Sequence, residues 1–565
     1  MMHCKKNARH VRDGLARFPG GVMTRTDRHE TPEPWWRGAV IYQIYPRSFQ
    51  DSDGDGVGDL AGIVGRLDHV ARLGADAIWI CPFFPSPMRD FGYDVSDYCG
   101  VDPLFGTLED FDTLVSHAHD LGIKVLIDQV YSHCSDRHPW FQESRISRDN
   151  ARADWFVWAD AKPEGSPPNN WQSVFGGPAW TWDARRRQYY LHNFLKEQPQ
   201  LNLHNPQVQE ALMGVARFWL ERGVDGFRVD VAHGLIKAEG LPDFDHDEHA
   251  DSMGGGAGPL PPWWAQDGVH EIWRHWRRLV DSYDGDRVLA AEAWVSPLSL
   301  MSKWVRSDEM HQAFNFEYLS TEWDATALRA VIDESRAEFG AVGAPSTWVL
   351  SNHDVVRHAS RMALSAENPQ GHGIGPDSPG LPDPVLGLRR ARAATLLMLA
   401  LPGSAYIYQG EELGLPEAIH IPAEARQDPT WHRTAGERYG RDGCRVPVPW
   451  EADAPAFGFS PTGSAWLPQP AEWSELARDR QSADHRSTLS MYQRALHLRR
   501  EHGIGAGNIA WLDMPAGVLG LRVGELTVIA NVDGPEVLLP DGDVLVASGP
   551  VAGSIPQDTC VWIAA

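Results

Sequence analysis

Short apolar runs alternate with longer amphipathic stretches along most of the chain after residue 38. Runs such as AVIYQIYP (39–46), AIWICP (77–82) and KVLIDQV (124–130) are rich in β-branched and aromatic residues, which favour strands. Between them, residues 63–74 and 108–122 repeat apolar positions every three or four residues, as amphipathic helices do. This order predicts parallel strands with helical crossovers, in an open doubly wound sheet or a closed barrel.

Later apolar runs continue the same pattern, so that about eight strands can be counted. No glycine-rich phosphate-binding turn follows the first run, which favours a closed (β/α)8 barrel over a nucleotide-binding open sheet. The later runs are GVDGFRVDV (223–231), RVLAAEAW (287–294), AFNF (313–316), STWVLSNHD (346–354) and SAYIYQGEE (404–412).

Two long segments interrupt the rhythm and divide the predicted barrel. Residues 132–205 are rich in Pro, Trp and Asn and too long for an ordinary loop, which predicts an inserted domain after the third strand. The barrel then comprises residues 35–131 and 206–505, with an irregular insertion at about 413–467. A helix is expected at 487–501, and the alternation in VLGLRVGELTVIANV predicts an antiparallel β-domain over 506–565. Residues 1–34 are polar and basic, and we expect a disordered N-terminal extension.

Composition narrows the class of partner. The chain has 565 residues and a net charge of −25, which disfavours nucleic acids and anionic membranes as partners. No run reaches the roughly 18 apolar residues of a membrane span, and the six cysteines show no C-x-x-C spacing. We therefore expect a cytoplasmic protein without an organic cofactor, whose 24 tryptophans could in part stack on sugars.

Charged and polar residues stand where several predicted strands end, and the carboxyl ends of barrel strands are where catalytic groups collect. In GFRVDVAHG, Arg228 and Asp230 are two residues apart, so they point to the same face while Phe227 and Val229 face the other way. Similar positions follow the other strands: Asp128, Glu292, His353 with Asp354, and Glu411 with Glu412.

Asp230, Glu292 and Asp354 are the candidate catalytic residues. Retaining glycoside hydrolysis requires one ionised and one protonated carboxyl group on either side of the scissile bond. Arg228 would keep Asp230 ionised as a nucleophile, and the apolar setting of Glu292 would raise its pKa, as a general acid requires. Any one of these carboxylates alone would be read as a structural ion pair, but three on successive strand ends favour catalysis.

The ordered motifs resemble the α-amylase superfamily of glycoside hydrolases (family 13), and within it the α-glucosidases and oligo-1,6-glucosidases. The resemblance covers the chain from about residue 35 to the end. The motifs are GYDVSDY (92–98), DQVYSH (128–133), QPQLN (198–202), GFRVDVAH (226–233), EAW (292–294), SNHD (351–354) and GSAYIYQGEELG (403–414).

The resemblance implies roles for individual residues. Asp230 would be the nucleophile, Glu292 the general acid/base and Asp354 the transition-state stabiliser. Arg228, His133 and His353 would contact the sugar, with Tyr93 stacking beneath it. An Asp and an Arg bind the non-reducing end in exo-acting relatives, and here Asp94 and either Arg441 or Arg445 match.

Val231 occupies a position that shapes linkage preference in relatives. A Val at this position favours cleavage of α-1,6 bonds, whereas the sequence after it favours cleavage of α-1,4 bonds.

Two positions depart from the family pattern. Ser132 stands where the family usually has Asn, so one hydrogen bond near Asp128 is expected to be lost or replaced by water. Gln200 stands where a carboxylate is common. Neither change falls on the three catalytic candidates.

An acidic loop, DSDGDGVGDL, follows the first predicted strand. Its alternating oxygen ligands resemble a loop that binds a structural Ca²⁺ or Mg²⁺ in this subgroup. The alternative is an acidic turn without a metal. The candidate ligands are Asp51, Asp53, Asp55, Val57 and Asp59.

The sequence therefore predicts a retaining, exo-acting α-glucosidase for short α-glucosides, as a monomer or homodimer. One alternative is a glucosyl-transferring or isomerising enzyme, in which a sugar replaces water. An alternative of another class is a non-catalytic binding or scaffold protein, although such relatives lack one or more of the three carboxylates and carry a membrane span.

Overall fold

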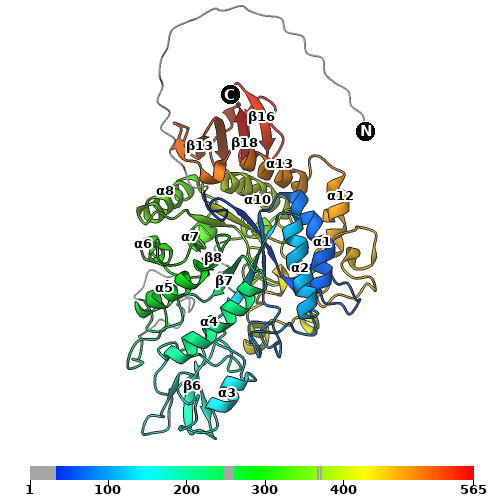
Figure 1. Cartoon of the computed structure of the whole chain (residues 1–565). Coiled ribbons are helices and arrows are strands. Elements are labelled where there is room, and N and C mark those ends of the chain that lie inside the picture. Colours follow the sequence, from blue (N-terminus) through cyan, green and yellow to red (C-terminus); the bar gives the residue numbers. More distant parts are fainter. Residues whose placement is uncertain (1–32, 246–259, 366–367, 369–371, 565) are drawn as a thin grey trace, which may run out of the picture. The chain divides into compact units, whose positions relative to one another are not determined.

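The centre of the protein is an eight-stranded parallel sheet (Figure 1). The computed structural model describes residues 33–245, 260–365, 368 and 372–564, so the predicted disorder of the N-terminal extension falls mainly outside the described residues. The strand order is β10-β11-β1-β2-β3-β7-β8-β9, and a parallel bridge from Phe314 to Thr347 joins its two ends. The strands are β1 (Val40–Ile44), β2 (Ala77–Ile80), β3 (Lys124–Val130), β7 (Gly226–Asp230), β8 (Val288–Ala291), β9 (Gln312–Ala313), β10 (Thr347–Val349) and β11 (Ser404–Tyr408). The predicted barrel is confirmed: β9 begins just before its predicted run, and the other strands lie inside theirs.

Helices surround this barrel in Figure 1 and bury the outward-facing strand residues. Helix α1 begins where the Asp59 carboxylate accepts the amide of Gly62, and it ends at Gly74, whose φ of 100° a glycine adopts readily. The helices are α1 (Leu60–Leu73), α2 (Leu108–Asp120), α4 (Pro206–Glu221), α5 (Gly268–Val280), α6 (Leu298–Met301), α7 (Phe316–Ser320), α8 (Ala325–Ala341), α9 (His358–Arg361), α10 (Pro384–Leu399), α11 (Pro429–Arg433), α12 (Arg478–Ser482) and α13 (Thr488–Glu501).

A small β-structure separates β3 from α4. It contains α3 (Pro139–Ser144) and the antiparallel strands β4 (Trp158–Ala159), β5 (Trp180–Asp183) and β6 (Gln188–Leu191), in the order β4-β6-β5. Its loops run back onto the barrel rim, since His133, just after β3, forms an antiparallel bridge with Gln200. The structure thus has a separate element group where the sequence predicts an insertion.

The C-terminal region forms a five-stranded antiparallel sheet in the order β12-β13-β14-β18-β16. Trp562 of β18 is fully buried, and its indole N–H donates to the carbonyl oxygen of Leu396 in α10, which ties this sheet to the barrel. The strands are β12 (Ile509–Trp511), β13 (Val518–Val523), β14 (Leu526–Asn531), β16 (Asp543–Ala547) and β18 (Thr559–Ala564), with β15 (Val537–Leu538) pairing separately with β17 (Ser554–Ile555).

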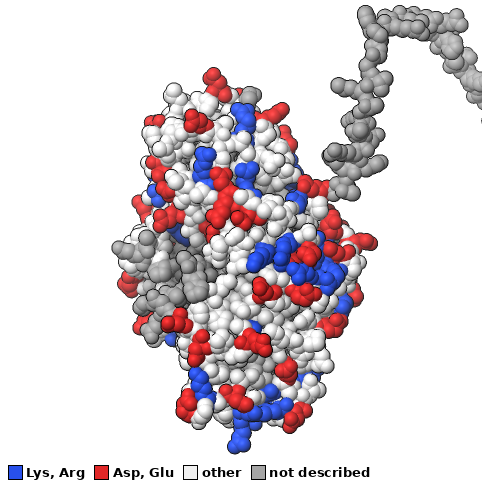
Figure 2. Space-filling model, turned by 90° about the vertical axis from the view of Figure 1, so that its left-hand side faces the viewer, with Lys and Arg blue, Asp and Glu red and all other residues white. Residues whose placement is uncertain are grey.

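The surface carries charges of both signs. On the face shown in Figure 2, acidic side chains are spread from top to bottom and a group of basic side chains lies near the middle. The excess of acidic groups is therefore dispersed on this face. Among the described residues, no helix combines the length and apolar character that crossing a membrane requires.

The pleat of the strands gives the barrel two apolar layers, one between the strands and the helices and one inside the barrel. It also explains where the polar residues of the barrel lie. Alternate residues pack outward against the helices, such as Tyr42, Phe227 and Val229. The intervening residues, such as Ile41, Trp79 and Tyr406, fill the barrel interior. Polar side chains that follow the inward alternation therefore lie inside the barrel or at its rim.

Candidate active site

Strands β3 and β7 place three charged groups side by side inside the barrel. Their register pairs Asp128 with Arg228 and Val130 with Asp230. All three charged residues are buried. The predicted common face of Arg228 and Asp230 is confirmed, because Arg228 Nη1 lies 2.8 Å from Asp230 Oδ1.

Arg228 is the positive centre of this cluster. Its Nη1 also donates to both oxygens of Asp128, at 2.9 and 3.1 Å, and its Nη2 lies 3.9 Å from Glu292 Oε2. The guanidinium lies 4.8 Å from the ring centroid of Trp79. One buried cation therefore reaches three carboxylates, and the cost of burying it is offset by those contacts.

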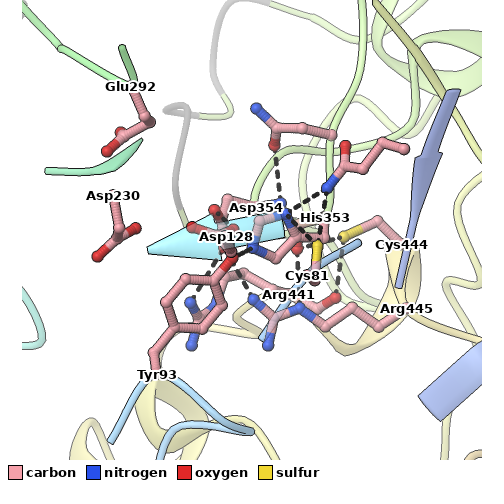
Figure 3. Close-up of polar contacts among 12 residues, drawn as sticks. Cys81, Tyr93, Asp128, Asp230, Glu292, His353, Asp354, Arg441, Cys444 and Arg445 are labelled. Carbon is pink, nitrogen blue, oxygen red and sulfur yellow. Dashed lines mark hydrogen bonds and ion pairs between the residues drawn. The ribbon is translucent and has the colours of Figure 1, made fainter. Parts of the chain in front are cut away.

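Asp230 and Glu292 lie on one side of the cluster (Figure 3). Burial raises the pKa of both carboxyl groups, and the neighbouring Arg228 opposes the rise in each. Arg228 hydrogen-bonds Asp230 directly but lies 3.9 Å from Glu292, so its charge stabilises the Asp230 anion more strongly. The arrangement suits one ionised and one protonated carboxyl group.

The backbone after Asp230 holds Glu292. The amide of Val231 donates to Glu292 Oε2 at 2.6 Å, and the amide of Ala232 donates to the Glu292 carbonyl oxygen at 2.8 Å. Val231 has a φ of 45°, which is unusual for a β-branched residue. Its side chain is buried against the outer core, so this turn positions Glu292 as well as ending β7.

Asp354 lies opposite these two carboxylates, among cations. Its Oδ1 accepts from Arg445 Nη2 at 2.8 Å and from Arg441 Nη1 at 3.1 Å, and its Oδ2 lies 3.2 Å from His353 Nε2. Burial alone would raise the pKa of Asp354, but His353 and the two arginines hold it well below its usual range. Asp354 is therefore an anion at neutral pH.

The acidic partner of Arg441 at the rim is Asp90, and the expectation of Asp94 is wrong. Arg441 Nη2 lies 2.9 Å from Asp90 Oδ1. Asp94 is fully buried, and its oxygens accept from Ser86 Oγ and from the amides of Arg89 and Asp90 at 2.8 to 3.0 Å. Asp94 therefore caps the loop that presents Asp90.

The same contacts decide between the two candidate arginines. Arg441 bridges Asp90 and Asp354 and is held from behind by Asp428, 2.6 Å from its Nε. Arg445 reaches Asp354 but otherwise donates to the His353 carbonyl oxygen. Arg441 is thus the arginine that pairs with the rim aspartate.

Tyr93, His133 and His353 complete the cluster. The rings of Tyr93 and His353 are parallel, with centroids 5.4 Å apart, and the Tyr93 hydroxyl lies 2.7 Å from His353 Nε2. His133 Nε2 lies 3.1 Å from the Tyr93 carbonyl oxygen, and burial lowers the pKa of His133 to about 3. Ser132, at the departure from the family pattern, hydrogen-bonds His133 Nδ1 at 2.7 Å.

A model of the α-amylase catalytic domain matches residues 43–506, which include all of these groups. The chain belongs to the α-amylase family of glycoside hydrolases. It is 46% identical over 508 residues, 87% of each chain, to a probable α-glucosidase of Rhizobium meliloti. It is 35% identical to an oligo-1,6-glucosidase of Heyndrickxia coagulans, covering 83% of this chain and 86% of that one.

Solved structures agree with this assignment. The crystal structure of an α-glucosyl transfer enzyme, XgtA, superposes with a TM-score of 0.82 at 40% identity, covering 94% of this chain and 99% of that one. The chain is therefore similar along almost its whole length to enzymes of this glycoside hydrolase family. This agreement confirms the predicted family and the predicted class of enzyme.

The acidic loop after β1 brings three of the predicted ligands of this glycoside hydrolase together. Asp51, Asp53 and Asp59 each offer an oxygen, and these atoms lie within 4.8 Å of one another. Backbone amides of the loop donate to Asp51, which holds the turn closed. Asp55 is not part of this cluster, and its Oδ1 accepts the amide of Val57 at 2.7 Å. The donor set fits a hard divalent cation such as Ca²⁺ or Mg²⁺.

The carboxylates after β11 serve another purpose in this hydrolase. Glu412 accepts from the Tyr42 hydroxyl at 2.8 Å and lies 2.9 Å from His69 Nε2, behind the barrel wall. Glu411 accepts the Tyr408 amide, and burial raises its pKa to about 8. Within the described part of the chain, Glu411 and Glu412 hydrogen-bond to groups outside the catalytic cluster. We therefore assign both carboxylates a structural role.

Proposed function

We propose that the protein is a retaining, exo-acting α-glucosidase that releases glucose from the non-reducing end of short α-glucosides. The observation that carries the proposal is the unequal contact of Arg228 with Asp230 and Glu292. Burial raises the pKa of both groups, but the direct hydrogen bond favours the ionised form of Asp230 over that of Glu292, to which we assign the proton that the leaving group needs.

The reaction follows from these protonation states. A carboxylate oxygen of Asp230 attacks the anomeric carbon while Glu292 transfers its proton to the glycosidic oxygen, whose bond to that carbon breaks. Glu292, now ionised, takes a proton from water as the water attacks the glucosyl–Asp230 ester. Asp230 is released as a carboxylate, and glucose leaves with its original anomeric configuration. The anion of Asp354 stabilises positive charge on the sugar in both steps.

Exo-action is supported by the ion pair between Asp90 and Arg441. The pair joins the β2 loop to the irregular segment that carries Arg441 and Asp428. Arg441 also contacts Asp354, with Nη1 3.1 Å from Oδ1, and we propose that the hydroxyls of a terminal glucose are bound beside it. If this pair closes the rim, one glucose residue is expected to be bound beyond the cleavage point.

Linkage preference is part of the proposal, with α-1,4 bonds favoured slightly over α-1,6 bonds. A Val at the position of Val231 is typical of oligo-1,6-glucosidases and supports α-1,6 cleavage. The residues that follow Val231 resemble those of other α-glucosidases. Val231 directly follows Asp230 in the chain, its side chain is buried and its φ is 45°. Initial rates on maltose, isomaltose, trehalose and sucrose test this preference.

Glucosyl transfer is the second candidate activity, because the chain is similar to an α-glucosyl transfer enzyme over 94% of its length. Both activities use the same glucosyl–Asp230 intermediate and differ in what attacks it. Product analysis at high maltose concentration separates them, since a transferase produces larger or rearranged glucosides and little free glucose. A hydrolase produces two glucose molecules for each maltose.

Asp51, Asp53 and Asp59 are proposed to hold a structural Ca²⁺ or Mg²⁺, with Asp55 and the Val57 carbonyl as further ligands. The metal would neutralise the loop that precedes α1 and would take no part in the chemistry. We also propose a cytoplasmic location, supported by the five described cysteines, all of which are free thiols.

The proposed activity is tested with purified protein and 4-nitrophenyl α-glucoside. The wild-type protein is expected to release nitrophenol, and Asp230→Asn is expected to lose at least about 10³-fold in kcat, because an amide is a poor nucleophile. Equal thermal unfolding of the two proteins serves as the folding control. A wild-type protein inactive on every α-glucoside tested, or a fully active Asp230→Asn, would contradict the proposal.

A further inference from the structure

Gln43 is an unusual residue for a fully buried strand such as β1. The strand reads VIYQI, all five residues are buried, and Gln43 itself is 1% exposed. It points into the barrel with Ile41 and Tyr45, both of which belong to the interior apolar cluster. A buried amide is costly unless its polar atoms find partners, so its contacts require an explanation.

The Gln43 side chain reaches the catalytic cluster. Its Nε2 lies 2.8 Å from His353 Nδ1 and 3.2 Å from Cys81 Sγ, and Figure 3 shows Cys81 and His353 meeting at this point. His353 comes directly before Asp354 and stacks on Tyr93. Gln43 thus contacts the nitrogen of His353 that faces away from the carboxylates.

The opposite nitrogen of His353 faces hydrogen-bond acceptors. Asp354 Oδ2, 3.2 Å from Nε2, belongs to an ionised carboxylate. The Tyr93 hydroxyl, 2.7 Å from Nε2, donates its own hydrogen to Asp128 Oδ2 at 3.1 Å, so its oxygen accepts from the imidazole. His353 Nε2 must therefore carry a hydrogen.

His353 cannot carry a second hydrogen at low cost. It is buried, and burial lowers its pKa well below the usual value, although Asp354 opposes this effect. The ring is therefore neutral, and its Nδ1 must accept a hydrogen bond. The Gln43 amide can supply that hydrogen only from its nitrogen and not from its oxygen, which fixes the orientation of the amide as well.

We propose that Gln43 is a positioning residue that holds His353 in the tautomer with its hydrogen on Nε2. In this form Nε2–H faces the Tyr93 hydroxyl oxygen and the Asp354 carboxylate. The reverse tautomer would present a lone pair to the Asp354 anion. The inference rests on the proposed function for its effect on catalysis, but the tautomer itself requires no substrate.

The first test is spectroscopic and uses the whole protein without substrate. Protein labelled with ¹⁵N-histidine is examined by proton–nitrogen correlation, and the His353 signals are assigned by their loss in His353→Ala. The expected result is a protonated Nε2 and an unprotonated Nδ1 between pH 6 and 8. A protonated Nδ1 in the wild-type protein would overturn the proposal whatever the enzyme hydrolyses.

The second test compares Gln43→Leu and Gln43→Glu by kcat and KM. The leucine variant removes the donor and is expected to lose about 10- to 100-fold in kcat/KM, consistent with one lost buried hydrogen bond. Ile41→Val, on the same strand and the same face, is the control for packing and is expected to stay within about threefold of wild type. Wild-type kcat/KM in Gln43→Leu would contradict the inference.

Gln43→Glu distinguishes a tautomer effect from a packing effect. The introduced carboxyl group can donate a hydrogen bond to Nδ1 when it is protonated. Its ionised form can only accept a hydrogen bond, so it favours the tautomer with a hydrogen on Nδ1. The variant-to-wild-type ratio of kcat/KM is therefore expected to fall as the pH rises, while the ratio for Gln43→Leu stays flat. The titratable groups that face this position directly are Cys81 and His353. The charged groups around those two are Asp128, Asp354, Arg228 and Arg445. Because wild type and variants share all of these groups, the wild-type value of kcat/KM at each pH is the reference. A flat ratio for Gln43→Glu would assign Gln43 a packing role only.

The proposed function and the proposed His353 tautomer can fail separately. A wild-type protein without activity on α-glucosides would overturn the proposed function and leave the spectroscopic test decisive for the tautomer. An active wild-type protein with an Nδ1-protonated His353 would overturn the inference alone.

Discussion

Arg228 donates a 2.8 Å hydrogen bond from Nη1 to Asp230 Oδ1, although only Val229 separates the two residues. The pleat of β7 places both side chains inside the barrel and Val229 outside it. The same nitrogen also binds Asp128 on the neighbouring strand, so one guanidinium fixes two carboxylates at defined positions. This relationship is the basis of the proposed division of protonation between Asp230 and Glu292.

Replacing Arg228 by Lys tests that relationship. A lysine ammonium cannot span Asp128, Asp230 and Glu292 at once, so the Asp230 anion loses stabilisation and its pKa rises. We expect kcat/KM to fall about 10²-fold or more, and the acid limb of its pH profile to move to higher pH. The profile is measured with 4-nitrophenyl α-glucoside. Arg222→Lys, in an exposed ion pair with Asp112, is the matched control and should leave the profile unchanged.

Asp90 and Asp94 are expected to respond differently to the same substitution. Asp90→Asn weakens the ion pair with Arg441 and should lower kcat/KM, chiefly through a higher KM, with little change in thermal stability. Asp94→Asn turns an amide N–H toward backbone donors and should cost about 1–3 kcal/mol of unfolding free energy. Kinetics and thermal unfolding of both variants provide the check. Loss of substrate affinity in Asp94→Asn alone, without destabilisation, would restore the original assignment.

Calcium is expected to stabilise the loop that holds Asp51, Asp53 and Asp59. After treatment with EDTA, millimolar Ca²⁺ should raise Tm by a few degrees, because a ligand at 100 times its Kd contributes about 2.7 kcal/mol. Asp53→Asn keeps an oxygen that can accept the Asp55 amide but removes a charge, so it should reduce this rise. An identical rise in both proteins would argue against a metal at this loop.

Glu411 should make the protein less stable in alkaline solution. Burial raises its pKa to about 8, above that of an unfolded chain, so the folded protein keeps a proton that the unfolded chain releases. Its contribution to stability is complete below about pH 4.5 and is lost as the pH rises toward 8. Glu411→Gln cannot ionise and should therefore gain in Tm relative to wild type at pH 8–9, but not at pH 5. A constant difference across this range would contradict the burial argument.

The sequence was sufficient for the barrel and for its inward-facing charges because strand alternation fixes both, whereas the rim residues Tyr93, His133, His353 and Arg441 were predicted from the family resemblance. Arg228, Asp230 and Glu292 stand where the period of two turns them inward, and the structure brings them together with Asp128 and Asp354. The roles of these residues in catalysis stay predictions until the variants are measured.

Other contacts depend on loop conformation, which local pattern does not determine. Asp90 and Asp94 lie in the same loop, and only the turn around Gly92 decides which carboxylate is buried as a cap and which faces Arg441. Asp428 and Arg441 both lie outside the family motifs, in the irregular segment after β11, so the motifs alone do not show that they pair. Gln43 could have been noticed as a polar residue inside an apolar strand, but its partner His353 is 310 residues away.

The configuration of the first-formed glucose tests the central claim most directly. Proton NMR of the anomeric region, recorded within seconds to minutes of adding enzyme to 4-nitrophenyl α-glucoside, distinguishes the two anomers before mutarotation equilibrates them. Attack by Asp230 followed by attack of water predicts that α-glucose appears first. Initial release of β-glucose would show a single displacement by water and would contradict the assignment of Asp230 as nucleophile and Glu292 as acid/base.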